Sequence, residues 1–195
     1  CYVYAGLAVM PGNAHECPLL YRLVENFVQQ VGRGVLKLLI VDRGFVDGPN
    51  ITRCKKEWGC DVLLPMKKRM DIWNDAWALS KETPWLARAL PTPPPKPVPA
   101  ERPEVIVRRE AKRQKTLAAK RAEAPAPDPA SVLQRTETCS IKGLTSWTDC
   151  AVPIQALLLR ETYADGHEQE WGLMGTAEEV TPGQFKDQYD WRTRV

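Results

Sequence analysis

The chain has 195 residues, of which 44% are hydrophobic and 26% are charged, a composition typical of a globular protein with one domain-sized core. No window approaches the roughly 20 apolar residues of a membrane span, and no basic segment precedes the first apolar stretch, so we expect neither a membrane protein nor a secretory signal. The net charge is +3, and residues 101–124 alone carry eight Lys or Arg against four Asp or Glu, so the overall basicity does not by itself predict that the rest of the chain binds nucleic acid.

The first part of the chain alternates strand and helix patterns. Residues 2–10 are rich in β-branched and aromatic residues, which predicts a strand. Apolar residues then recur at helical spacing between Pro18 and Gly32, where proline suits the first turn and glycine the C-terminal end. Residues 35–41 form an apolar run broken only by Lys37, which is typical of a strand covered on both faces.

The same alternation continues after this run. The sequence pattern predicts a helix over residues 49–58, which ends at Gly59. It also predicts a short strand over residues 61–65 and another helix over residues 70–79. A chain that alternates strands and helices in this way is expected to form an α/β core, with a sheet between helices.

The middle of the chain has a different composition, because ten of its seventeen prolines lie in residues 91–129. Residues 91–103 cannot hold a helix and predict a polyproline linker. Residues 105–124 are rich in Arg, Lys, Ala and Glu and predict an exposed helix. Such a helix could follow a DNA backbone, but interspersed acids and the lack of aromatic residues favour a solvated linker.

Regular structure is expected again from Thr138 onward. Residues 152–162 predict a strand, and the dipeptide Asp165-Gly166 predicts a hairpin turn into a partner strand around residues 170–174. These strands are expected to form a small β insertion that returns to the core.

The last predicted element is a helix that begins at Thr181. Thr181 is a suitable N-cap, and Gln184 completes a capping-box pattern. The expected division of the chain is a first part of the core over residues 1–79, a Pro-rich and basic insertion over 80–137, a small β insertion over 138–170, and a return to the core over 171–195.

Asp42 directly follows the apolar run and begins the sequence Asp-Arg-Gly-Phe. In open α/β sheets, ligands bind outside the carboxyl ends of strands, and Gly44 would permit a sharp turn and the close approach of a ligand. Two interpretations stay open: Asp42 belongs to a site, or it caps the following turn or pairs with Arg43. A single carboxylate is insufficient for magnesium chemistry, so a catalytic Asp42 needs partners.

Other candidate residues have equally simple structural explanations. Lys67 and Lys68 follow the strand predicted over residues 61–65 and are candidates to bind backbone phosphates, or are two solvated lysines at a strand end. The six cysteines include no CxxC pair, so the spacing predicts neither a zinc site nor a disulfide framework. A reducing cytoplasm is therefore the expected location.

Five stretches together resemble the DDE-type insertion-sequence transposases, whose catalytic domain is similar to ribonuclease H. They are VMPGNAHECPLL (9–20), LLIVDRGFVDG (38–48), DVLLPMKKRMDIWNDA (61–76), EWGLMGT (170–176) and FKDQYDWR (185–192). The resemblance covers about half of the chain. It implies a ribonuclease-H-like mixed sheet flanked by helices and interrupted by the Pro-rich, basic and small β insertions.

The resemblance also implies roles for particular residues. Asp42 matches the second catalytic aspartate and would be a metal ligand. Tyr189 and Arg192 match a signature of Tyr, two residues, Arg, three residues and Glu, whose Glu would fall at position 196. The family's first aspartate would lie before Cys1, so we expect a fragment, truncated at both ends, that is inactive by itself.

The function implied for the complete protein is DNA cleavage and strand transfer during transposition, with Mg²⁺ or Mn²⁺ as cofactor. Arg43, Lys67, Lys68, Tyr189 and Arg192 would then contact DNA, at the transposon ends and target. A homodimer and a cytoplasmic, nucleoid-associated location in a prokaryotic-type cell would accompany this function. Two alternatives stay open: a non-catalytic DNA-binding or interaction remnant of a transposase-derived gene, and a structure-selective nuclease of the same fold.

Overall fold

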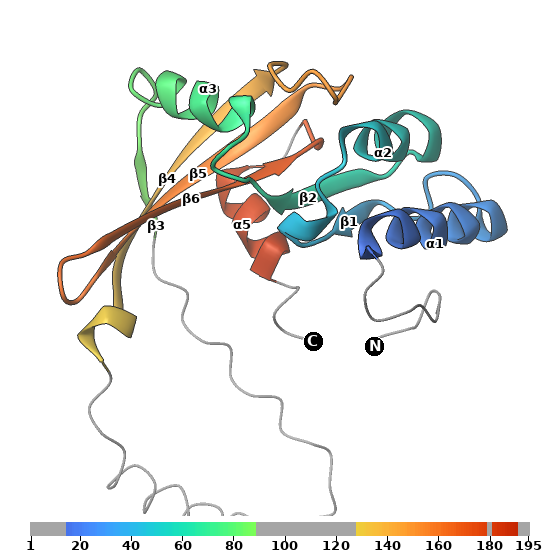
Figure 1. The fold of residues 1–195 in the computed structure, drawn as a ribbon. Coiled ribbons are helices and arrows are strands. Elements are labelled where there is room, and N and C mark those ends of the chain that lie inside the picture. The colour runs from blue at the N-terminus through green and yellow to red at the C-terminus, as the bar shows by residue number, and fades with distance from the viewer. Residues whose placement is uncertain (1–14, 89–127, 179–180, 191–195) are drawn as a thin grey trace, which may run out of the picture.

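A six-stranded mixed sheet flanked by helices organises the α/β fold in the computed structural model, which describes residues 15–88, 128–178 and 181–190 (Figure 1). The strands are β1 (Leu38–Ile40), β2 (Asp61–Pro65), β3 (Leu86–Arg88), β4 (Leu133–Leu144), β5 (Ile154–Tyr163) and β6 (Glu168–Gly175). The helices are α1 (Glu16–Val31), α2 (Gly48–Arg53), α3 (Asp71–Leu79) and α5 (Pro182–Asp190), with short turns η1 (Arg43–Phe45), η2 (Cys54–Trp58) and η3 (Pro129–Ser131).

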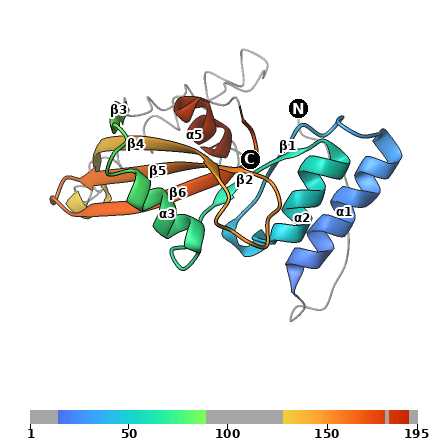
Figure 2. The ribbon, with the colours of Figure 1, turned by 90° about the horizontal axis from the view of Figure 1, so that it is seen from above.

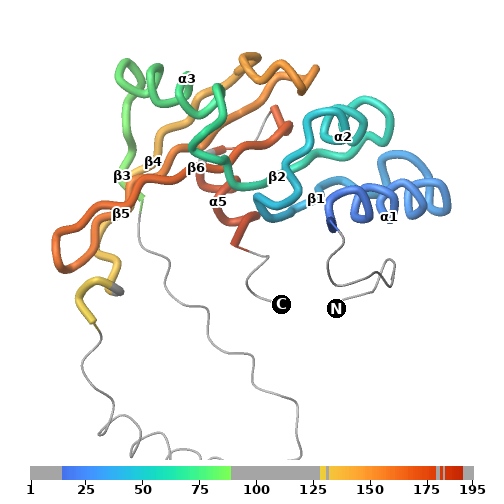
Figure 3. Tube along the Cα trace, viewed as in Figure 1, coloured from blue at the N-terminus to red at the C-terminus, as the bar shows by residue number. Residues whose placement is uncertain are grey.

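The strand order across the sheet is β1-β2-β6-β5-β4-β3. β1 and β2 are parallel, with Leu39 opposite Val62, and every other neighbouring pair is antiparallel. The strands expected as a small β insertion therefore do not form a separate unit: β6 pairs directly with β2, and β4 to β6 continue the sheet that β1 and β2 begin (Figure 3).

β5 lies in the middle of this sheet and explains why the extension is stable. Its residues from Ile154 to Leu159 are all buried, and all of them except Gln155 are apolar, which fits a strand covered on both faces. Leu158 packs in the cluster that contains residues of α1, α2 and α3, whereas Leu157 and Leu159 pack in a second cluster with Phe185 and Tyr189 of α5. Figure 2 shows α3 and α5 on opposite sides of the sheet.

The predicted helices form with small changes at their ends. α1 buries Tyr21, Val24 and Val28 on one face and begins at Glu16, where the backbone N–H of Cys17 donates to Nδ1 of His15 over 3.3 Å. The helix predicted over residues 49–58 is α2 followed by one π turn, and it ends as expected at Gly59, which has a φ of 66°.

The capping box predicted at the start of α5 is confirmed. The backbone N–H of Gln184 donates to Oγ1 of Thr181 over 3.3 Å, and the backbone N–H of Thr181 donates to Oε1 of Gln184 over 3.1 Å. The helix then places Phe185 against the sheet, where the side chain is 1% exposed. The capping box thus fixes the direction in which α5 crosses the second cluster.

The five described cysteines are packing residues. Cys54 and Cys60 are fully buried beside the π turn, and Cys17, Cys139 and Cys150 are also buried and free of disulfides. Burial raises the pKa of both Cys54 and Cys60 to about 12, so these thiols are protonated at neutral pH.

Some expectations differ from the structure or lie beyond it. The strand expected over residues 35–41 is shorter, because Val35 is 57% exposed and β1 is an edge strand among the described residues. β3 and the first half of β4 were not predicted. The strand over residues 2–10, the linker over 91–103 and the helix over 105–124 lie outside the described residues. No described helix combines the length and apolar character needed to cross a membrane.

Candidate functional site

A cavity of about 880 Å³ opens where β1 and β2 end, next to β6 and α5. We call it the strand-end cavity. It is lined by Asp42, Arg43, Gly44, Pro65, Met66, Lys67, Lys68, Arg69, Trp73, Gln169, Glu170, Trp171, Gly172 and Tyr189. Because β1 and β2 are parallel, their carboxyl ends meet at one edge of the sheet, as expected for a ligand site in an α/β protein.

Asp42 reaches this cavity from the end of β1. The strand is held to β2 as far as Val41, whose N–H donates to the carbonyl oxygen of Leu63 over 3.0 Å. Asp42 is exposed, and its Oδ1 accepts a hydrogen bond of 2.7 Å from the backbone N–H of Arg43. Asp42 therefore caps the η1 turn and also lines the cavity, so the two interpretations of this residue are compatible.

A side chain of α1 holds the η1 turn by a hydrogen bond. The backbone N–H of Phe45 donates to the carbonyl oxygen of Asp42 over 3.0 Å, and the hydroxyl of Tyr21 donates to the carbonyl oxygen of Phe45 over 2.7 Å. Burial raises the pKa of Tyr21, so its hydroxyl keeps the proton that it donates. The backbone around Asp42 is thus held by side chains of the core.

Gly44 has a different role from the one expected. It does not have a positive φ, and a Cβ built on it would meet no atom within 4 Å, so the turn itself does not require glycine. Gly44 does line the strand-end cavity. The close approach of a ligand therefore stays a prediction, while the sharp-turn explanation is wrong.

Three consecutive cations follow β2. The N–H of Met66 donates to the carbonyl oxygen of Gly172 over 2.8 Å, which holds the end of β2 against β6. Lys67, Lys68 and Arg69 come next, and all three are exposed. Nζ of Lys68 lies 5.7 Å from the ring centre of Trp73, within the range of a cation–π contact.

Aromatic residues of β6 and α5 also line the cavity. The ring centres of Trp171 and Tyr189 are 6.4 Å apart, and Nζ of Lys186 lies 5.4 Å from the Trp171 ring. Tyr189 is 9% exposed and belongs to the second core cluster, so it packs the core as well as lining the cavity.

The strand-end cavity has an excess of positive charge. Four cationic side chains line it (Arg43, Lys67, Lys68 and Arg69) against the two carboxylates of Asp42 and Glu170, an excess of two positive charges. The carboxylate of Glu170 is also engaged by Arg160, which donates to its Oε1 from two nitrogens over 3.0 and 3.2 Å. This net positive charge of the lining residues favours an anionic ligand.

Five of the predicted site residues line this one cavity: Asp42, Arg43, Lys67, Lys68 and Tyr189. Arg192 lies outside the described residues. Sequence reasoning missed Arg69, Trp73, Glu170 and Trp171 as lining residues. All four fall within the stretches that carry the resemblance, but single-residue patterns do not show which strands of a sheet are neighbours.

The described residues do not form a complete magnesium or manganese site. Among them, no three His, Cys, Asp or Glu side chains lie close enough together to hold a metal ion. Of the two carboxylates at the cavity, Asp42 caps the η1 turn and Glu170 is paired with Arg160. Asp42 could contribute one ligand of the several oxygen ligands that such ions require.

Comparison of the chain with protein-family models, with curated proteins and with solved structures gives no match.

Proposed function

We propose that the chain is part of a DDE-type DNA transposase with a ribonuclease-H-like core, and that the strand-end cavity binds the DNA backbone. One observation carries this proposal: five residues from three separate segments of the chain, for which the resemblance implies one site, line one cavity with an excess of positive charge. Lys67, Lys68 and Arg69 are exposed there, as side chains that contact phosphates must be.

The topology supports the ribonuclease-H-like part of the proposal only in part. The resemblance implies an aspartate that follows a central strand. Asp42 follows β1, which pairs in parallel with β2 but is an edge strand among the described residues. The additional strands β4 to β6 fall between Asp42 and α5 in the sequence. This is where many of these transposases carry an insertion.

Metal-dependent cleavage and strand transfer belong to this proposal as properties of the complete protein, with Asp42 as a ligand of Mg²⁺ or Mn²⁺. Such an ion would supply the activation of a nucleophile at the phosphodiester. The described residues offer too few carboxylates to hold such an ion alone. Their own contribution is to bind and orient the DNA backbone through Arg43, Lys67 and Lys68.

Charge reversal tests the binding part of the proposal. Lys67→Glu places a carboxylate where a phosphate is expected and should weaken binding of a DNA duplex by about tenfold or more at low salt. Lys142→Glu makes the same change in net charge at an exposed residue of β4 that does not line the cavity. Equal losses in the two variants, measured by fluorescence anisotropy, would show that only the overall charge matters.

Asp42→Asn separates the enzyme from the non-catalytic remnant. In an active transposase this variant, in the full-length protein with Mg²⁺, should lose DNA cleavage and keep both its fold and its DNA affinity. Undiminished cleavage would show that Asp42 is not a metal ligand. If the wild type binds DNA but never cuts it, the remnant is favoured, and cleavage without strand transfer favours the structure-selective nuclease.

A further inference from the structure

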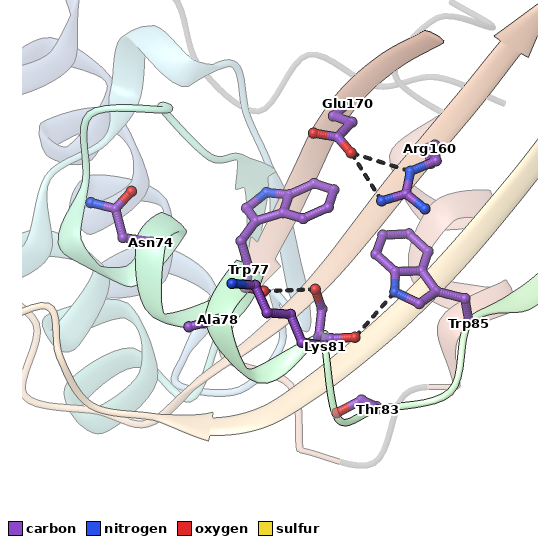
Figure 4. A pocket seen from close by; sticks show the side chains of 9 residues that line it. Asn74, Trp77, Ala78, Lys81, Thr83, Trp85, Arg160 and Glu170 are labelled. Carbon is purple, nitrogen blue, oxygen red and sulfur yellow. Dashed lines mark hydrogen bonds and ion pairs between the residues drawn. The ribbon is translucent and has the colours of Figure 1, made fainter.

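A second cavity lies beside α3 (Figure 4), and α3 is on the opposite side of the sheet from α5 (Figure 2). It has a volume of about 490 Å³, within the roughly 300–1,000 Å³ typical of ligand pockets. We call it the aromatic cavity. It is lined by Asn74, Trp77, Ala78, Ser80, Lys81, Thr83, Trp85, Arg160 and Glu170. The proposed DNA-backbone contacts do not use it.

A hydrogen bond holds the indole of Trp85 in this cavity, whereas Nε1 of the Trp77 indole is buried and has no hydrogen-bond partner among the described residues. Trp85 donates its Nε1–H to the carbonyl oxygen of Ser80 over 3.2 Å, and the hydroxyl of Ser80 donates to the carbonyl oxygen of Trp77 over 2.8 Å. The ring centres of Trp77 and Trp85 are 5.4 Å apart. Both indoles are half-buried, so part of each aromatic surface remains accessible.

Arg160 supports these rings. Its guanidinium carbon lies 4.6 Å from the ring centre of Trp85 and 5.9 Å from that of Trp77. The same guanidinium makes two hydrogen bonds to Glu170, so its charge is compensated. The cavity therefore offers an ordered aromatic surface beside an ion pair whose atoms can hydrogen bond to the edge of a ligand.

The aromatic cavity and the strand-end cavity are neighbours, and two features connect them. Glu170 lines both of them. In addition, Trp73 lines the strand-end cavity, and its ring centre is 5.5 Å from that of Trp77, so three indoles follow one another from Trp73 through Trp77 to Trp85. Lys68 lies over the ring of Trp73, at the beginning of this row, and Lys81 lines the aromatic cavity.

We infer that the aromatic cavity binds an unpaired nucleobase of single-stranded DNA whose backbone lies in the strand-end cavity. This inference rests on the proposed function and specifies that the bound DNA is single-stranded. A row of indoles flanked by cations is the combination that binds single strands, because every base has a stacking face and every nucleotide a phosphate. A duplex keeps its bases stacked inside the helix, so its bases could not use this surface.

The test compares two oligonucleotides of equal length, one of thymidine and one abasic throughout, which carry the same phosphates. The wild-type chain should bind the thymidine strand about tenfold more tightly, as expected from stacking of one base. Trp85→Leu should reduce this preference to about twofold or less, whereas Trp85→Phe keeps an aromatic ring and should retain most of it. Trp147→Leu, which removes an indole outside both cavities, should leave the preference unchanged.

The outcomes separate this inference from the proposed function. Equal binding of the two strands by the wild type overturns the base site and leaves the phosphate site intact. Binding of the thymidine strand alone supports the base site and contradicts the phosphate site, and binding of neither overturns both. If circular dichroism shows that Trp85→Leu is unfolded, the wild type and Trp85→Phe still test the base site, because both must prefer the thymidine strand.

Discussion

The middle of β5 and the end of β2 are both close to α3, yet they serve different purposes. Leu157, Leu158 and Leu159 of β5 are fully buried, whereas Lys67 and Lys68 after β2 are exposed and line a cavity. The free energy of folding is therefore concentrated in the sheet centre, and the charged residues at the strand ends are available for binding. Substitutions in the two regions should affect different measurements.

The largest expected effect is on stability in the sheet centre. Leu158→Ala leaves a cavity under α3 and should lower the free energy of unfolding by about 2–5 kcal/mol. Leu86→Ala is the same substitution in β3, where the side chain is 58% exposed. It should change the free energy of unfolding by less than about 0.5 kcal/mol. Chemical denaturation measures both, and similar losses would mean that β5 is not the buried centre.

A smaller effect is expected where the two regions meet, at α5. Thr181→Ala removes the N-cap of the helix that carries Phe185 and Tyr189 and should cost about 1 kcal/mol. Because Tyr189 lines the strand-end cavity, DNA affinity should fall slightly as well. Thr181→Asn, which can cap a helix, is the control and should retain stability and binding.

The smallest effect on stability is expected at Gly44. A substitution there should affect DNA binding without lowering stability, unlike a substitution in the sheet centre. A Cβ there would meet no atom within 4 Å, so Gly44→Ala should leave the protein as stable as before or more stable by about 0.4–1 kcal/mol. If a DNA backbone approaches Gly44 closely, the added methyl group should nevertheless weaken DNA binding. A variant with unchanged affinity would contradict close approach at this residue.

The sequence predicted the elements that depend on local patterns. The strand over residues 61–65 is β2, the hairpin turn at Asp165-Gly166 joins β5 to β6, and the capping box of Thr181 and Gln184 begins α5. Each depends on residues close together in the chain, because backbone hydrogen bonds of helices and tight turns are local.

Contacts between distant segments were not predictable in this way. β4 alternates buried and exposed residues irregularly and has two shifts in its pairing with β5, so its pattern is weak. Trp171 and Glu170 reach the strand-end cavity only because β6 pairs with β2, a pairing between residues about 110 positions apart. The positions of Asp42, Lys67 and Lys68 followed from strand ends, but their neighbours did not.

The salt dependence of DNA binding tests most directly the claim that the strand-end cavity holds phosphates. For a variant that lacks both Lys67 and Lys68 (Lys67→Ala with Lys68→Ala), the slope of the logarithm of the binding constant against the logarithm of salt concentration should be smaller in magnitude by about 2, since each phosphate contact contributes about 0.9. The matched double variant Lys37→Ala with Lys142→Ala, which changes two exposed lysines outside the cavity, should keep the wild-type slope. An unchanged slope in the Lys67 and Lys68 variant, with its fold intact, would contradict the account.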